Sequence, residues 1–179
     1  MAAKAVETPA EPKGSNDSSQ RNRSSSIQVV EFVLGKENFA IDLFDVKEVV
    51  EYTTITKLPN VPAYIKGIID LRGEITTIVD LKHRLNITEE SMVAAESSRI
   101  IVLDDKITDT KIGILVDDVT SVSTFEGKQV DYTSASVSKE DTAIIGIIKR
   151  KVKIKDKEKN ELIIWIDIKQ LLGNIDASQ

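Results

Sequence analysis

The sequence contains no cysteine, one histidine and only eight aromatic residues among 179. Without cysteine the chain has no disulfide framework, no thiolate nucleophile and no cysteine-based zinc site. A single histidine excludes a metal centre built from several histidines. No apolar run approaches the ~20 residues that cross a bilayer, and the N-terminus lacks the apolar stretch of a signal peptide. We therefore expect a cytoplasmic protein without direct membrane insertion.

Net charge and aliphatic content indicate which partners and which fold class to expect. The chain has 24 Lys and Arg against 29 Asp and Glu, a net charge of −5. Nucleic-acid binders normally carry a basic face, so no nucleic acid is expected as a partner. Ile and Val together supply 41 residues, and these stiff, β-branched side chains favour pleated strands. The composition predicts a mainly β fold.

Residues suited to catalysis are scarce. His83 lies between two basic residues on the expected solvated face of a short helix, so we assign it no catalytic role. The adjacent carboxylates Asp104-Asp105 and Asp117-Asp118 each follow an apolar strand, where Asp commonly forms turns. No phosphate-binding glycine loop and no nucleophile elbow occurs. We expect a protein that is not an enzyme and that binds no cofactor or metal.

The first half of the chain reads as strands after a polar tail. Residues 1–26 are rich in Ala, Ser, Pro and charge, which predicts a disordered tail before a folded part over 27–179. Ile27–Leu34 and Phe39–Leu43 are expected to be strands joined by a turn. Val46, Val49 and Val50 fall at helical spacing, which predicts a short helix. A polar strand is expected near Glu51–Lys57.

A hairpin follows. Ile65–Leu71 and Ile75–Val79 are predicted to pair around a turn at Arg72-Gly73-Glu74. Asp80 is expected to cap a short helix that begins at Leu81.

The second half repeats this order. Ile100–Leu103 matches Val29–Phe32 at an offset of 71 residues, and Gly113-Ile114-Leu115 matches Ala40-Ile41-Asp42 at 73. Further matches follow at offsets of 79 and 87, the last pairing Asp167 with Asp80. We interpret the chain as two copies of a unit of about five strands. Such a sheet can remove its exposed edges by closing into a small barrel.

One stretch is strongly basic. Lys149–Asn160 alternates Lys with Val and Ile, which predicts a half-buried strand followed by a turn at Asp156–Asn160. A solvated hairpin is the favoured interpretation, and a contact for an acidic partner is the alternative.

Several motifs in fixed order resemble the CheW family of chemotaxis coupling proteins over about residues 27–175. The most specific is Pro62-x-Tyr64-Ile65-Lys66-Gly67-Ile68-Ile69-Asp70-Leu71-Arg72-Gly73, completed by Ile78-Val79-Asp80-Leu81. Earlier pieces are Phe32-x-Leu34-Gly35, Phe39-Ala40-Ile41-Asp42 and Val46-x-Glu48-Val49, and later ones are Gly113-Ile114-Leu115-Val116-Asp117-x-Val119 and Leu171-Leu172. The sequence departs from the usual pattern at Asp70, where the family has Asn, and at Thr77, where it often has Pro.

The resemblance implies a fold, a function and a set of contacts. The fold would be two intertwined five-stranded SH3-like β-barrels with short connecting helices. The function would be a non-catalytic adaptor that couples chemoreceptors (methyl-accepting chemotaxis proteins) to the regulatory domain of the histidine kinase CheA. The protein would be a monomer when free and would be recruited to membrane-associated receptor arrays.

Site residues carry over position by position. Val46, Glu48, Leu71 and Arg72 would face the receptor, near the groove between the barrels, and Lys66 and Gly67 would be weaker contacts for the kinase or another partner. From the residues alone, a regulatory binding module for another two-component kinase stays open. A small β-barrel enzyme is opposed by the missing catalytic residues, and a barrel that binds RNA is opposed by charge and scarce aromatics.

Overall fold

The computed structural model describes residues 25–88, 94–132 and 143–176. The predicted disordered tail lies outside these residues except at its last positions, where Ser26 already begins the first strand. The elements are β1 (Ser26–Leu34), β2 (Glu37–Asp42), β3 (Val46–Glu51), β4 (Ile65–Leu71), β5 (Glu74–Asp80), α1 (Leu81–Arg84), β6 (Arg99–Leu103), β7 (Ile112–Val116), β8 (Asp118–Glu126), β9 (Val130–Asp131), β10 (Ile144–Ile154), β11 (Lys157–Ile166) and α2 (Ile168–Asp176), with 3-10 turns η1 (Leu43–Asp45), η2 (Ala95–Ser97) and η3 (Gly127–Gln129).

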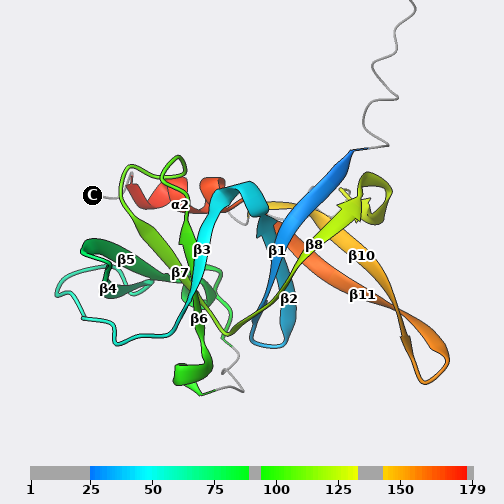
Figure 1. The fold of residues 1–179 in the computed structure, drawn as a ribbon, viewed down its shortest axis with the longest axis horizontal. Coiled ribbons are helices and arrows are strands. Elements are labelled where there is room, and N and C mark those ends of the chain that lie inside the picture. The colour runs from blue at the N-terminus through cyan, green and yellow to red at the C-terminus, as the bar shows by residue number, and fades with distance from the viewer. Residues whose placement is uncertain (1–24, 89–93, 133–142, 177–179) are drawn as a thin grey trace, which may run out of the picture.

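The fold is mainly β and consists of two mixed sheets (Figure 1). The first sheet has the order β8-β1-β2-β11-β10-β9, and the second has the order β3-β6-β7-β5-β4. Each contains one parallel pair, β2 with β11 and β5 with β7. The first sheet has six strands where five were expected, because the two-residue strand β9 pairs with the edge of β10.

The two sheets exchange strands between the two copies of the repeat. β1 and β2 of the first copy lie in one sheet with β8, β10 and β11 of the second copy, and the other sheet has the reverse combination. Ile78 lies opposite Gly113 in one parallel pair, and Trp165 lies opposite Ala40 in the other. These pairs correspond at the offsets of 87 and 73 residues read from the sequence. Each sheet is therefore complete only when both copies contribute.

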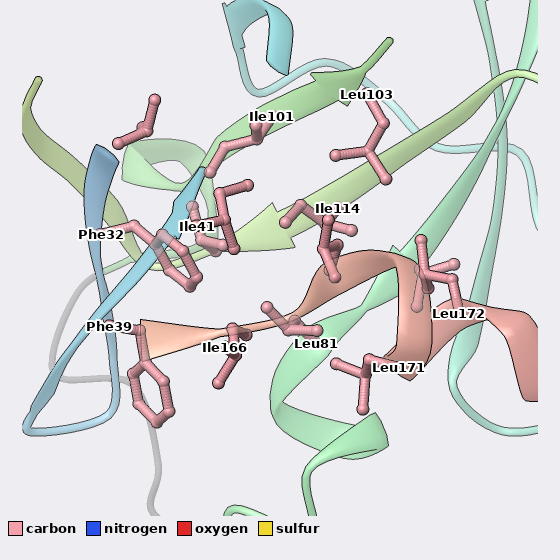
Figure 2. Packing of buried hydrophobic residues seen from close by; sticks show 14 of the residues in the cluster. Phe32, Phe39, Ile41, Leu81, Ile101, Leu103, Ile114, Ile166, Leu171 and Leu172 are labelled. Atoms are coloured by element: carbon pink, nitrogen blue, oxygen red, sulfur yellow. The ribbon is translucent and has the colours of Figure 1, made fainter. Parts of the chain in front are cut away.

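A central hydrophobic cluster joins the two sheets. Figure 2 shows Phe32 and Ile41 of the first sheet near Ile101 and Ile114 of the second, with Leu171 of α2 in the same cluster. All five side chains are buried. A smaller cluster around Trp165 lies within the first sheet, and another around Ile78 lies within the second. The largest core is therefore the one shared between the sheets, so neither sheet buries its apolar face alone.

Two secondary-structure predictions in the first half of the chain were wrong. Val46–Glu51 forms the strand β3 and not a helix, because its side chains alternate between half-buried and exposed positions against β6. The polar strand expected near Glu51–Lys57 is reduced to a single bridge between Thr56 and Ile68. The first error arose because three valines fit the helical period and the strand period with similar success over so short a stretch.

The predicted hairpin and helix caps were confirmed. β4 and β5 pair around Arg72 and Gly73. Asp80 accepts a hydrogen bond from the backbone N–H of His83, and Asp167 accepts one from that of Gln170. His83 itself is exposed. The turn predicted at Asp156–Asn160 was misplaced: the reversal is the tight pair Lys155-Asp156, both at positive φ, and the residues after it belong to β11.

Candidate functional site

The receptor-facing residues expected from the sequence lie on the second sheet. Glu48 is on β3, Leu71 ends β4 and Arg72 follows it in the hairpin turn. These three line a hollow of about 60 Å³. Small-molecule sites are typically ~300–1,000 Å³, so this hollow suits contact with a protein surface. Its described lining residues all belong to the second sheet and its loops. The hollow therefore does not lie between the two sheets, where the groove was expected.

A paired hydrogen bond fixes the hairpin tip against β3. The guanidinium of Arg72 donates from Nη1 to Oε1 of Glu48 at 3.1 Å and from Nη2 to Oε2 at 2.9 Å. The Arg72 side chain is 75% exposed and that of Glu48 is 24% exposed. A bidentate arginine–carboxylate pair holds its geometry better than a single contact. The free face of the guanidinium is therefore presented to solvent in a defined orientation.

The turn itself places Arg72 in an unusual backbone conformation. Arg72 has φ of 53° and Gly73 has φ of 84°. Two successive positive φ values are the signature of a type I′ hairpin turn, where Asn-Gly is preferred to Arg-Gly. Asp70 accepts a hydrogen bond from the N–H of Gly73 at 2.8 Å. The carboxylate at this family-variant position thus caps the turn, while Arg72 pairs with Glu48.

A chain of surface ion pairs borders the hollow and was not predicted from the sequence. Lys111 contacts Glu74 at 2.7 Å and Asp105 at 3.4 Å, and Lys47 contacts the other oxygen of Asp105 at 3.4 Å. The hydrogen bond from Lys111, followed by the charges of Lys111 and Lys47, lowers the pKa of Asp105. The hydrogen bond to Glu74 raises the pKa of Lys111. Lys47 and Asp105 are 58 positions apart in the sequence and come together through the β3–β6 pairing.

Val46 lies next to this site but points elsewhere. It is half-buried and packs against the central cluster that joins the two sheets. Phe44, two residues earlier, is 66% exposed, and Ile75 on β5 is 60% exposed. Sequence reasoning did not single out either residue, although a large apolar residue in a turn or beside a hairpin tip is the signal that could have found them.

Lys66 and Gly67 lie toward the opposite end of β4. Lys66 approaches Asp80 at 3.9 Å and is about half exposed. Gly67 is buried, with φ of 148°, and a Cβ there would lie 2.1 Å from the carbonyl oxygen of Thr56. Thr56 and Ile68 exchange two backbone hydrogen bonds across this contact. The structure therefore explains Gly67 by the close approach of two backbone segments.

No three His, Asp or Glu side chains gather into a possible metal site within the described ranges. No helix in the same part of the chain is long and apolar enough to cross a membrane.

Comparison with known proteins identifies the family. The model of the CheW-like domain matches residues 28–176. The chain belongs to the CheW family. It is 29% identical to the chemotaxis protein CheW of Bacillus subtilis over 153 residues, 85% of this chain and 90% of that protein. It is 34% identical to the CheW of Treponema pallidum over 97 residues, which span 53% of this chain and 56% of the relative.

A solved structure agrees with the fold. The scaffolding protein TtCheW from Thermoanaerobacter tengcongensis superposes with a TM-score of 0.66 at 35% identity, covering 83% of this chain and 93% of that one. The CheW-like fold expected from the sequence is therefore confirmed. The chain is a non-catalytic chemotaxis adaptor that couples chemoreceptors to the histidine kinase CheA.

Proposed function

We propose that the receptor-facing surface of this CheW-family chain is the hollow at Glu48, Leu71 and Arg72. The observation that carries the proposal is the bidentate Arg72–Glu48 pair, which holds an exposed side chain at a hollow that the half-buried Leu71 also lines. Arginine is enriched at the energetic centres of protein interfaces. An oriented cation beside an apolar floor suits the tip of a helical hairpin whose apolar side chains are bordered by carboxylates or carbonyl oxygens.

The charged rim adds selectivity to this surface. Lys47, Asp105 and Lys111 alternate in sign along one side of the hollow. Exposed pairs of this kind contribute little to stability, about 0–1 kcal/mol each, so they are free to exchange partners on docking. Val46 supports the site by anchoring the start of β3 in the central cluster.

Binding to isolated receptor tips tests the proposal. Arg72→Glu is expected to abolish retention of a receptor signalling-tip fragment while far-UV circular dichroism and the thermal transition stay near those of the wild type. The control is Lys57→Glu, which makes the same charge change at an exposed position outside the hollow. Equal retention by Arg72→Glu and the wild type would refute the assignment.

A charge-swapped double variant separates the two roles of Arg72. In Glu48→Arg/Arg72→Glu the intramolecular pair can re-form with reversed polarity. If Arg72 served only to hold Glu48, receptor binding would return in the double variant. We expect no recovery, because the cation presented to the receptor would then come from a different place.

We further propose that Lys66 contributes to the kinase contact. Its side chain is about half exposed and lies at the other end of β4 from the proposed receptor surface. Gly67 can take part only through its backbone. The free protein is proposed to be a cytoplasmic monomer that joins the receptor array through these two surfaces. Sedimentation of the free protein, and CheA binding by Lys66→Glu, test these points separately.

A further inference from the structure

The hairpin of β10 and β11 extends well beyond the first sheet (Figure 1). β9 pairs with β10 only at Ile147 and Ile148, and β2 pairs with β11 only from Ile163 to Trp165. Within the described residues, the two strands from Lys149 to Leu162 therefore pair only with each other. In that part of the chain, both outer edges of this ribbon, residues 149–162, have no strand partner.

The ribbon is basic in an acidic chain. Residues 149–161 hold seven cations and three carboxylates, against a net charge of −5 for the whole protein. One of the three carboxylates, Glu161, is already paired with Arg150 at 2.7 Å. Among the described residues, Lys151 and Lys153 form no ion pair and are exposed. Lys151 lies opposite Asn160 across the hairpin and Lys153 lies opposite Glu158, with no ion pair between Lys153 and Glu158 in the described part.

The open edge of β10 has a different character on each face. Lys151 and Lys153 point to one face, because successive side chains of a strand alternate. Val152 and Ile154 point to the other face, and Ile154 is 54% exposed. The β11 edge carries no apolar face over residues 157–161, because Lys157, Lys159 and Glu161 lie on one face and Glu158 and Asn160 on the other.

An open groove runs beside the start of this edge. It has a volume of about 590 Å³ and lies between η3 and β10, with Lys128 on one wall and Lys149 and Lys151 on the other. Lys128 pairs with Glu126 at 2.9 Å on the surface, and Lys149 pairs with Asp131 at 3.4 Å. The groove therefore borders β10 just beyond Ile148, where its pairing with β9 ends.

We propose that the β10 edge of the ribbon, Lys149–Ile154, binds an extended segment of a partner protein in which acidic and apolar residues alternate. The segment adds as a strand, so that its backbone groups pair with those of β10. Its acidic side chains lie beside Lys151 and Lys153 on one face. Its apolar side chains cover Val152 and Ile154 on the other.

The same lysines prevent the edge from pairing with a second copy of itself. Lysine on an exposed edge strand normally deters association, because like charges meet across the new pair. This repulsion acts only against a basic strand, and an acidic strand converts it into attraction. The edge is therefore selective by charge for its occupant.

Other anionic partners fit the ribbon less well. A flat lipid surface would meet one face of the ribbon and leave the backbone edge unpaired. Single-stranded nucleic acid would require aromatic platforms for its bases, and residues 149–162 contain no aromatic side chain. A strand uses the edge and both faces at once.

Binding of synthetic peptides to the full-length protein tests the proposal. The probe is a fluorescent peptide that alternates Glu with Val. Its controls are a peptide of the same composition with the charges in one block, and an alternating peptide whose amides facing the edge are N-methylated. We expect the alternating peptide to bind at least about tenfold more tightly than either control, a difference of about 1.4 kcal/mol.

Two double variants locate the site. Lys151→Glu/Lys153→Glu is expected to lower affinity for the alternating peptide by at least tenfold. The matched control, Lys57→Glu/Lys106→Glu, makes the same charge change at exposed positions in loops of the other sheet and is expected to leave this affinity unchanged. Arg72→Glu is also expected to leave it unchanged, which separates this surface from the receptor surface.

Three results would overturn the proposal. The first is equal binding of the alternating, block and N-methylated peptides, which would show that the peptides bind by non-specific charge attraction and not by strand pairing. The second is undiminished binding by the Lys151/Lys153 variant. The third is lysine-dependent binding to phosphatidylglycerol vesicles without any binding of the alternating peptide, which would make the ribbon a membrane contact.

Discussion

Arg150 on β10 reaches Glu31 on β1, with Nη1 3.0 Å from Oε1, although β11 and β2 lie between their strands. Three strand spacings in a flat sheet are about 14 Å, so the contact belongs to a sheet curled toward its inner face. Ser121 and Ser123 on β8 also donate hydrogen bonds to Glu31. Strands from both copies of the repeat thus meet at one buried carboxylate.

Glu31 makes stability depend on acid pH. Burial pushes its pKa upward, but the hydrogen bonds from Ser123, Ser121 and Arg150, with the charge of Arg150, together lower the pKa below the ordinary 4.5. A lowered folded-state pKa stabilises the fold at pH values above the unfolded-state pKa. This stabilisation is lost as the pH falls through the folded-state pKa.

Glu31→Gln is therefore expected to cost about 2 kcal/mol at pH 7, because Arg150 and the two serines lose a charged partner. It should also flatten the acid side of the stability curve below about pH 4.5. Urea unfolding at a series of pH values measures both effects. Glu158→Gln, on the exposed ribbon, is the control and should change neither; an unaltered acid slope in Glu31→Gln would contradict the prediction.

Arg72→Asn separates stability from receptor binding. Asn adopts positive φ more readily than Arg, which favours the turn by about 0.5–1 kcal/mol, and the lost exposed ion pair costs about 0–1 kcal/mol. The free energy of unfolding should therefore stay within about 1 kcal/mol of the wild type. Receptor affinity, measured by titration calorimetry, should fall at least tenfold. A parallel loss of stability and affinity would show that Arg72 acts through the fold.

Gly67 and Gly73 form a matched pair for backbone strain. Gly67→Ala would place a Cβ 2.1 Å from a backbone oxygen, whereas a Cβ at Gly73 meets nothing within 4 Å. Gly67→Ala is expected to cost about 3 kcal/mol or more through the forced backbone shift. Gly73→Ala is expected to cost about 1–2 kcal/mol, from its left-handed conformation alone. Thermal unfolding of the two variants under one buffer compares them, and equal losses would exclude the contact with Thr56 as the cause.

The exchange of strands predicts how fragments behave. Residues 1–88 contain β1 to β5, and residues 94–179 contain β6 to β11. β1 pairs with β2 in its own fragment and with β8 in the other, and β2 pairs with β11 in the other. Each fragment alone is expected to lack the native circular dichroism spectrum, and an equimolar mixture is expected to recover it. A cooperative thermal transition in either fragment alone would show that one copy can fold without the other.

Much of the fold was predictable because its signals are local. The β4–β5 hairpin was set by β-branched runs on either side of Arg72-Gly73, and the helix starts were set by Asp80 and Asp167. The strand β3 was missed because its valines fit two periods. No local signal could predict the exchange of strands. Two similar copies bury the same residues whether each forms its own sheet or the copies exchange strands.

The candidate site was predictable only in part. The motif positions of Glu48 and Arg72 could be named, but their contact depends on β3 and the β4–β5 tip approaching across the second sheet. The rim formed by Asp105 and Lys111 has no motif at all. Ion pairs between residues distant in sequence follow from register, and register is fixed by tertiary packing.

The order of the strands in the two sheets also determines when each strand can pair during synthesis. The second sheet uses only strands within residues 46–116, so its pairing can be completed before the rest of the chain has left the ribosome. β1 and β2 emerge first but must wait for β8, β10 and β11. Their apolar strands stay unpaired except with each other for most of translation, which is the interval in which such edges associate with other chains. The first strands to be synthesised, β1 and β2, are thus among the last to complete their pairing.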